Sequence, residues 1–103
     1  MSVMPPIHPG EILLEEFMEP LGLSQNRLAK ALGVDAGRIN RIVTGKCSIT
    51  ADTALRLAKY FGTTPELWMN LQSHYELEVA QDKKAKEIDE RVQVRPGLNT
   101  ATG

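Results

Sequence analysis

Residues 24–46 read SQNRLAKALGVDAGRINRIVTGK, and their spacing is that of two short helices joined by a tight turn. With Gln25 counted as the first position, the small residue Ala29 occupies the fifth and Gly33 the ninth. Apolar Ile39 occupies the fifteenth position. This spacing lets two helices cross closely around a three-residue turn. The stretch therefore predicts a helix-turn-helix, and DNA binding is the first hypothesis for function.

The length and composition of the chain exclude several classes of protein that could contain such a motif. At 103 residues the chain is long enough for one small domain but too short to enclose a deep active site. Its single cysteine, Cys47, excludes an intrachain disulfide, and its two scattered histidines are too few to complete a metal site. We therefore predict no metal and no cofactor. The absence of a secretory leader and of any run of 18 apolar residues predicts a cytoplasmic protein with no membrane span.

The net charge of −1 hides an uneven distribution of charge along the chain. Residues 1–20 carry a net charge of −4, residues 21–62 a net charge of +5 and the remaining residues a net charge of −2. The positive charge thus coincides with the predicted helix-turn-helix. Such segregation is expected when one face of a protein meets phosphates and another faces solvent or a protein partner.

Capping residues predict where the helices begin and end. Pro9 suits a first helical position, and an apolar stripe follows it until Pro20, which predicts a first helix over about 9–19. Side chains able to cap a helix N-terminus and glycines suited to its C-terminus alternate along the rest of the chain. They predict further helices over about 24–32, 35–44, 50–61 and 64 onward. No segment alternates apolar and polar residues as a strand would, so the fold class is all-α.

The apolar residues at helical spacing supply the expected core. These residues are Ile12, Leu13, Leu14, Phe17, Met18, Leu28, Ala29, Leu32, Ile39, Ile42, Val43, Ala54, Leu55, Leu57, Ala58 and Phe61. Trp68 is expected to anchor the core or a dimer interface.

The composition predicts four segments. Residues 1–8 form an N-terminal arm and residues 9–75 the helix-turn-helix domain. Residues 76–92 are rich in charged helix formers and predict a solvated C-terminal helix that serves as a dimer or partner surface. Residues 93–103 lack apolar anchors and predict a disordered tail.

A helical wheel of the second motif helix identifies the side that would enter a DNA groove. With Ile39 turned inward, Gly37, Arg41 and Thr44 point outward. Arg41 suits a bidentate pair with guanine. Since a glycine within a helix costs about 1 kcal/mol relative to alanine, Gly37 either permits close approach to DNA or is only tolerated.

Residues at the margins of that face complete the predicted site. Arg38 and Asn40 flank it, Arg38 as a phosphate or groove-edge contact and Asn40 as a partner for adenine. Ala36 lies at the N-terminus of the helix, which approaches base edges first in this motif.

Three further residues are predicted to bind the DNA backbone. Ser24 and Gln25 open the first motif helix, whose free amides favour a phosphate. Lys46 follows the second helix in a loop and is placed to reach a phosphate as well.

The chain resembles the Xre (Cro/C1-type) helix-turn-helix family through the Gln25–Ile39 pattern. Longer strings, His8-Pro9-Gly10-Glu11, Ile49-Thr50-Ala51-Asp52-Thr53-Ala54-Leu55-Arg56-Leu57-Ala58 and Trp68-Met69-Asn70-Leu71-Gln72, resemble the HigA antitoxin group, also called virulence-associated protein I. This resemblance covers about residues 5–92. It implies a five-helix, lambda-repressor-like domain with an extended C-terminal helix.

The resemblance also implies an activity and partners. The implied protein is a homodimeric repressor that binds an inverted-repeat operator, regulates its own operon and neutralises a RelE-like mRNA-cleaving toxin. A two-fold dimer has independent support, because one recognition helix reads only a few base pairs.

Other functions stay open at the level of sequence. A stand-alone Xre-family regulator without a toxin fits the same motifs. An interaction module that no longer binds DNA would use the acidic first helix or the 76–91 helix for docking. An enzyme is least favoured, because there is no paired-carboxylate cleft, no nucleophile with a base and no phosphate loop.

Overall fold

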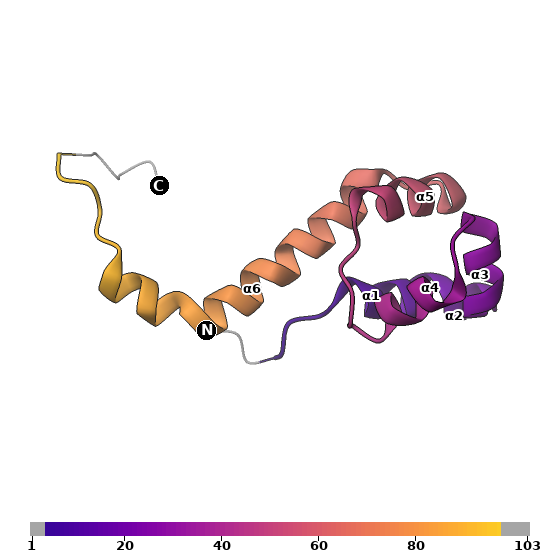
Figure 1. Ribbon diagram of the computed structural model, residues 1–103, viewed down its shortest axis with the longest axis horizontal. Helices are drawn as coiled ribbons and strands as arrows, with labels where there is room; N and C mark the ends of the chain where they lie inside the picture. The colour runs from indigo at the N-terminus through magenta and orange to yellow at the C-terminus, as the bar shows by residue number, and fades with distance from the viewer. Residues whose placement is uncertain (1–3, 98–103) are drawn as a thin grey trace.

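A computed structural model describes residues 4–97, and the regular secondary structure in that range is all helical, with no strand (Figure 1). This confirms the all-α prediction. The first helix is continuous and consists of α1 (Pro9–Ile12), the π-helical segment η1 (Leu13–Met18) and α2 (Glu19–Leu21). It is followed by α3 (Gln25–Leu32), α4 (Ala36–Val43), α5 (Ala51–Phe61) and α6 (Pro65–Arg91). Parts of the predicted arm and tail, residues 1–3 and 98–103, lie outside the described residues.

The predicted capping residues precede four helices and satisfy amides of their first turns. Ser24, Asp35, Thr50 and Thr64 each accept a hydrogen bond from the backbone amide three residues later. Gly33 and Gly62 end α3 and α5 with left-handed backbones, both at φ +74°. The helices begin one residue later than expected because a capping residue does not itself adopt the helical conformation.

The prediction that Pro20 ends the first helix is wrong. The helix widens ahead of the proline, and the Glu19 amide donates to the carbonyl of Leu14, five residues back. It continues to Leu21 and ends at Gly22, whose φ of +64° is left-handed. A proline lacks the amide that a regular ladder needs, and a π-helical turn shifts the hydrogen-bond pattern by one residue, so the helix passes Pro20 without breaking.

One apolar core joins the five helices. Its fully or almost fully buried members are Leu13, Met18, Leu28, Ala29, Leu32, Ile39, Ile42, Ile49, Ala54, Leu57, Ala58 and Trp68. Trp68 is completely buried beside Phe17, with ring centroids 4.9 Å apart, and its Nε1 donates to Thr63 Oγ1 at 2.8 Å. Trp68 is thus a core anchor. The expectation that Leu55 points inward is wrong, since it is 60% exposed on α5.

The C-terminal half of α6 leaves the helical body. Figure 1 shows α6 packed near α5 at its start and projecting alone beyond the other helices. Residues 80–97 are all exposed. The predicted 76–91 helix is therefore the continuation of α6, the helix that carries Trp68. Its projection makes the molecule elongated, with dimensions of 55 × 24 × 21 Å.

Candidate DNA-binding surface

The C-terminal end of α4, at Ile42 and Val43, is held against α1 through Gly10 and is called the inner end of α4 below. A Cβ atom added to Gly10 would overlap the backbone carbonyl of Ile42 and approach the Cα of Val43 to 2.9 Å. The two helices therefore cross backbone against backbone, which only glycine permits at this position. Sequence reasoning missed this contact, although Gly10 belongs to one of the strings that carry the family resemblance.

His8 fixes the same end of α4 from the side. Its Nδ1 caps α1 by accepting from the Gly10 amide at 2.9 Å, and its ring packs edge-on against Tyr75 of α6 with centroids 4.9 Å apart. It also faces Gly45, where an added Cβ would lie 3.8 Å from the imidazole. Burial lowers the pKa of His8, although a hydrogen bond with the Cys47 backbone and the charge of Glu11 act in the opposite direction.

Gln72 secures the loop that follows α4. Its side chain is 4% exposed, and its Oε1 accepts from the Ile49 amide at 2.8 Å while its Nε2 donates to Glu76 Oε2 at 2.9 Å. Because both the oxygen and the nitrogen of this buried side-chain amide are hydrogen-bonded, the positions of the groups that they bind are fixed relative to each other. The loop after α4 is thereby tied to α6.

The outer face of α4 matches the helical wheel. Gly37, Arg41 and Thr44 are exposed, whereas Ile39 and Ile42 are buried. Ala36, expected at the groove, is half-buried and packs against the core. In the first turn of α4, Gly37 is therefore more exposed to solvent than Ala36.

Two of the predicted contact residues are joined to each other across the motif. Asn40 Nδ2 of α4 donates to Gln25 Oε1 at the start of α3, at 3.1 Å. The Thr44 hydroxyl donates to the Asn40 carbonyl at 2.7 Å within α4. Ser24 and Lys46 are exposed, Ser24 as the cap of α3 and Lys46 in the loop after α4.

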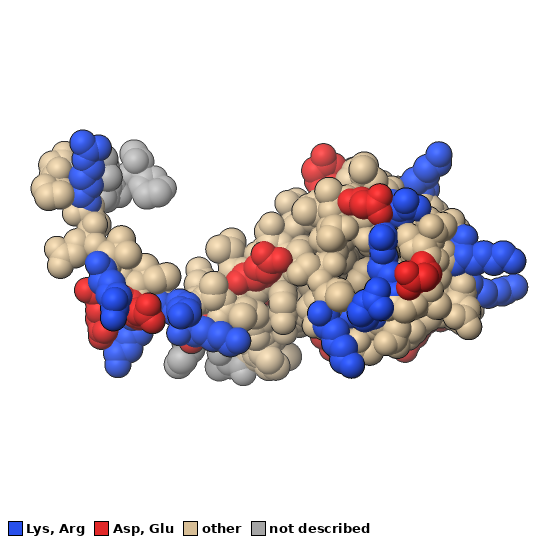
Figure 2. Space-filling model, viewed as in Figure 1, with Lys and Arg blue, Asp and Glu red and all other residues tan. Residues whose placement is uncertain are grey.

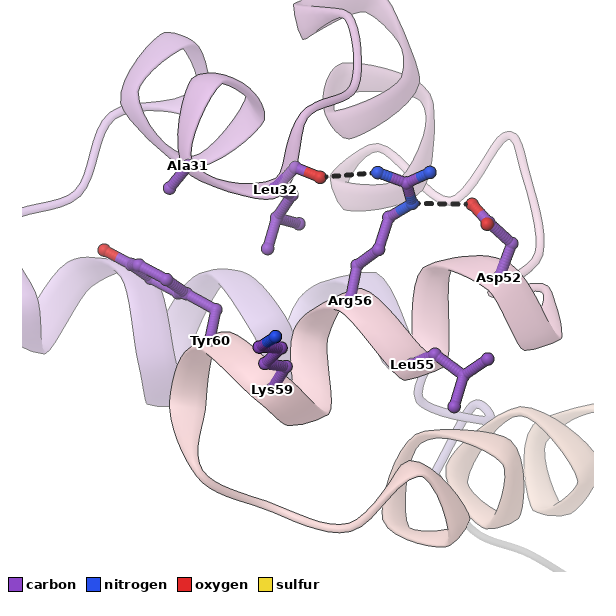
Figure 3. Close-up of a pocket in the computed structure, with 7 residues that line it drawn as sticks. All are labelled: Ala31, Leu32, Asp52, Leu55, Arg56, Lys59 and Tyr60. Atoms are coloured by element: carbon purple, nitrogen blue, oxygen red, sulfur yellow. Dashed lines mark hydrogen bonds and ion pairs between the residues drawn. The ribbon is translucent and has the colours of Figure 1, made fainter.

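Arg38 is bound by a carboxylate from the next helix. Its Nη1 donates to Asp52 Oδ2 at 2.9 Å, and Arg56 Nε donates to the same oxygen at 2.9 Å. Arg56 Nη1 also donates to the Leu32 carbonyl at the end of α3, at 2.7 Å (Figure 3). The hydrogen bonds from Arg56 and Arg38 lower the pKa of Asp52. One chain of polar contacts thus links α3, α4 and α5.

Asp52 had no role in the sequence-based prediction. The capping pattern placed it in the first turn of a separate helix, and nothing local indicates that it would meet Arg38, 14 residues earlier. Only the packing of α5 against the motif brings these groups together.

An open hollow of about 650 Å³ lies between α3 and α5 (Figure 3). Its lining residues are Ala31, Leu32, Asp52, Leu55, Arg56, Lys59 and Tyr60. Leu55 and Tyr60 contribute apolar surface here, while the carboxylate of Asp52 is held by two arginines. Paired in this way, Asp52 is a structural carboxylate.

Positive side chains gather at the motif end of the molecule. Figure 2 shows Lys and Arg over the part built by α3, α4 and α5, with a second group along the outer part of α6. Such a basic surface attracts a phosphate backbone.

Residues 4–97 offer neither a metal site nor a membrane-spanning helix. No group of three or more His, Cys, Asp or Glu side chains in this range is arranged to hold a metal ion. None of the helices there is both long and apolar enough to cross a membrane.

These features define a DNA-binding helix-turn-helix protein, and the chain belongs to the helix-turn-helix family, whose pattern matches residues 14–68. More narrowly, it is 56% identical over 86 residues to virulence-associated protein I of Dichelobacter nodosus, covering 82% of this chain and 80% of that protein. It is a member of the group formed by virulence-associated protein I and the HigA antitoxins, as the motifs predicted.

Two solved structures support this placement. A HigA-family addiction module antidote protein from Coxiella burnetii superposes with a TM-score of 0.85 at 52% identity, covering 89% of this chain and 100% of that one. The Pseudomonas aeruginosa antitoxin HigA, solved with the higBA promoter, superposes with a TM-score of 0.83 at 45% identity, covering 90% and 99%. This chain therefore shares its fold with both of these antitoxins.

Proposed function

We propose that this protein is a sequence-specific transcriptional repressor that binds an operator in its own promoter and acts as an antitoxin. The observation that carries the proposal is the outer face of α4, on which Arg41 is exposed. Figure 2 shows that Lys and Arg gather at the end of the molecule that contains α4. The similarity to an antitoxin HigA solved with the higBA promoter supports the same function. Its site of action is the cytoplasm.

The proposed contacts follow from the positions of the side chains. Arg41 meets a base edge from within the major groove, with Ala36, Gly37 and Thr44 beside it. Ser24, Gln25 and Lys46 meet phosphates, and Arg38 and Asn40 lie at the margins of the groove. Because the phosphate contacts carry no sequence information, they set register and affinity.

Homodimerisation is proposed to use the projecting part of α6. Leu77 and Ile88 are 62% and 51% exposed there, and a groove of about 300 Å³ runs between them, lined also by Ala80, Gln81, Ala85 and Asp89. A single helix of this composition gains stability mainly from packing its apolar stripe. In this arrangement residues 9–75 bind DNA, while residues 76–92 join two copies so that both recognition helices reach an inverted repeat.

Sedimentation tests the dimer. The protein at micromolar concentration is expected to sediment as a dimer, and Leu77→Lys with Ile88→Lys is expected to yield a folded monomer. Val94→Lys is the matched control, because Val94 is 64% exposed but lies beyond the end of α6. A clean monomer for the unaltered protein would contradict the proposal.

Toxin neutralisation is a second proposed activity, supported by the similarity to HigA antitoxins. We propose that the partner is a small basic RelE-like protein, and the exposed acidic side chains of the first helix offer it a surface of opposite charge. These side chains are Glu11, Glu15, Glu16 and Glu19. A stand-alone regulator is the outcome if no such partner exists.

A gel-shift assay on the DNA upstream of the protein's own gene tests the main proposal. We expect a salt-sensitive complex with one upstream segment and at least a thousandfold weaker binding to unrelated DNA, as is usual for specific recognition. Adding the product of the adjacent gene tests the toxin partnership through a change in mobility. Equal affinity for both DNAs would refute sequence-specific repression.

A further inference from the structure

We propose that α4 distinguishes bases through one side chain, Arg41, and that Gly37 is the specificity-determining position that makes room for it. This inference rests on the proposed DNA binding and states which operator the protein selects. Each half-site is expected to contain one strongly specified guanine, with its neighbours specified weakly.

The other polar side chains of the outer face are already engaged within the protein. Asn40 donates to Gln25 at 3.1 Å, and Arg38 donates to Asp52 at 2.9 Å. The Thr44 hydroxyl donates to a carbonyl of its own helix at 2.7 Å. Each contact fixes the orientation of its side chain while leaving other donors or acceptors of the group unused, so we assign these three residues as positioning groups that hold the motif.

The Asn40 contact assigns that residue a definite role. Gln25 Oε1 accepts from Asn40, which leaves the Gln25 amide nitrogen with both of its hydrogens free to donate. Gln25 opens α3, where a phosphate is expected. Asn40 therefore orients Gln25 toward the DNA backbone, in place of the adenine contact that the sequence predicts.

Arg41 differs from these residues in having no bonding partner for its side chain among the described residues and in the position of its guanidinium. Within residues 4–97 its guanidinium has no hydrogen-bond or ion-pair partner. A Cβ added to Gly37 would lie 3.1 Å from Arg41 Nη1 and 3.0 Å from Asp35 Oδ1. The guanidinium thus lies over the first turn of α4, in the space that a side chain at position 37 would fill. That turn enters the groove first in this motif.

The chemistry selects guanine. A guanidinium presents paired donors to the O6 and N7 acceptors that guanine alone displays together in the major groove. One such pair discriminates by about 5- to 150-fold against a wrong base. Gly37 and Ala36 have no polar group with which to specify a second base.

The experiment measures affinity for a set of operators in which each half-site position is changed in turn. For the unaltered protein, we expect one guanine whose replacement weakens binding about 5- to 150-fold and no other position above about fivefold. Arg41→Ala should abolish the dependence on that guanine. Asn40→Ala should weaken binding to every operator alike, and that loss should disappear when Gln25 is already alanine.

A double-mutant cycle that combines Gly37→Ala with Arg41→Ala tests the role of Gly37. Gly37→Ala should lower the preference for the guanine by roughly threefold or more, since a bidentate pair tolerates little displacement. The same substitution should have no effect on preference in an Arg41→Ala background. Because the neighbours of the added methyl are the ends of side chains, the variant is expected to fold, and its thermal stability confirms this.

The outcomes separate this inference from the proposed function. If no upstream DNA binds specifically, the proposed function fails and the inference fails with it. If DNA binds but two or more positions keep strong preferences in Arg41→Ala, only the inference is overturned. It is likewise overturned if Asn40→Ala changes the preference at one position, because that result identifies Asn40 as a base contact.

Discussion

The two sides of α4 both depend on a helical glycine, yet the two glycines act differently. At the inner end, a side chain on Gly10 would collide with the backbone of Ile42, which cannot move without shifting the helix. On the outer face, a side chain on Gly37 would meet only the ends of Asp35 and Arg41. The first glycine sets where the recognition helix lies, and the second sets what its arginine reaches. The cost of replacing a glycine therefore depends on whether its neighbour is backbone or a flexible side chain.

Gly10→Ala is the substitution with the largest expected effect. The added methyl must separate α1 from α4, and overpacking costs about 1–3 kcal/mol of unfolding free energy, here at the upper end because the obstacle is backbone. Urea denaturation followed by circular dichroism measures it. A loss below about 1 kcal/mol, within the ordinary range for point substitutions, would show that the two helices can part without strain.

His8 is expected to make the inner end sensitive to pH. Burial lowers the His8 pKa below its ordinary value of 6.5, so the unfolded chain binds the proton more readily than the folded one. The contribution of His8 to stability is therefore complete above pH 6.5 and is lost as the pH falls through the lower folded pKa. Protonated Nδ1 can no longer accept from the Gly10 amide, so α1 loses its N-terminal cap, which costs about 1 kcal/mol of unfolding free energy.

The control for this pH effect is His8→Asn, which keeps a capping oxygen but does not titrate. Denaturation curves at pH 7.5 and pH 5 are compared for the two proteins. We expect the unaltered protein to lose more stability than the variant over this interval. An identical loss in both would assign the effect to other groups.

Gly37→Ala is expected to change the stability of the fold only slightly, in contrast to Gly10→Ala. Alanine is favoured over glycine inside a helix by about 0.5–1 kcal/mol, but the Asp35 oxygen that caps α4 would lie 3.0 Å from the added methyl and must shift by a few tenths of an ångström, which offsets part of this gain. Thermal unfolding of both glycine variants in the same buffer makes the comparison direct. A strong destabilisation by Gly37→Ala would mean that the outer face is as rigid as the inner end.

Lys46→Ala has the smallest expected effect. Lys46 is exposed and its proposed contact is one phosphate, so its removal should weaken all DNA sequences alike and reduce the salt slope of binding by about 1. Titrations at several salt concentrations measure the slope. A change in sequence preference would show that Lys46 contacts a base.

The helices and the outer face could be predicted because their signals are local. Asp35 caps α4 only three residues from the amide it binds, and the exposure of Gly37, Arg41 and Thr44 follows from the helical repeat. The end of the first helix could not be predicted in this way. A proline normally stops a helix, and the π-helical turn that accommodates Pro20 depends on how the whole helix packs.

The parts of the site that sequence reasoning missed are contacts between distant segments. Asp52 meets Arg38 from another helix, and Asn40 meets Gln25 across the turn of the motif. A helical wheel shows which way a side chain points but not which group already occupies its donors. The wheel places Arg38 and Asn40 at the margins of the outer face, and only the structure shows that Asp52 and Gln25 each hold one donor of these residues.

The sequence by itself determined the all-α class, the helix-turn-helix, the basic segment and the outward position of Arg41, since capping, charge and helical periodicity act within a few residues. The tertiary structure alone decided that Gly10 locks α1 against α4 and that Asn40 and Arg38 are held by Gln25 and Asp52. These contacts join residues that are far apart in the chain, and only the packing of whole helices brings them within hydrogen-bonding or van der Waals distance.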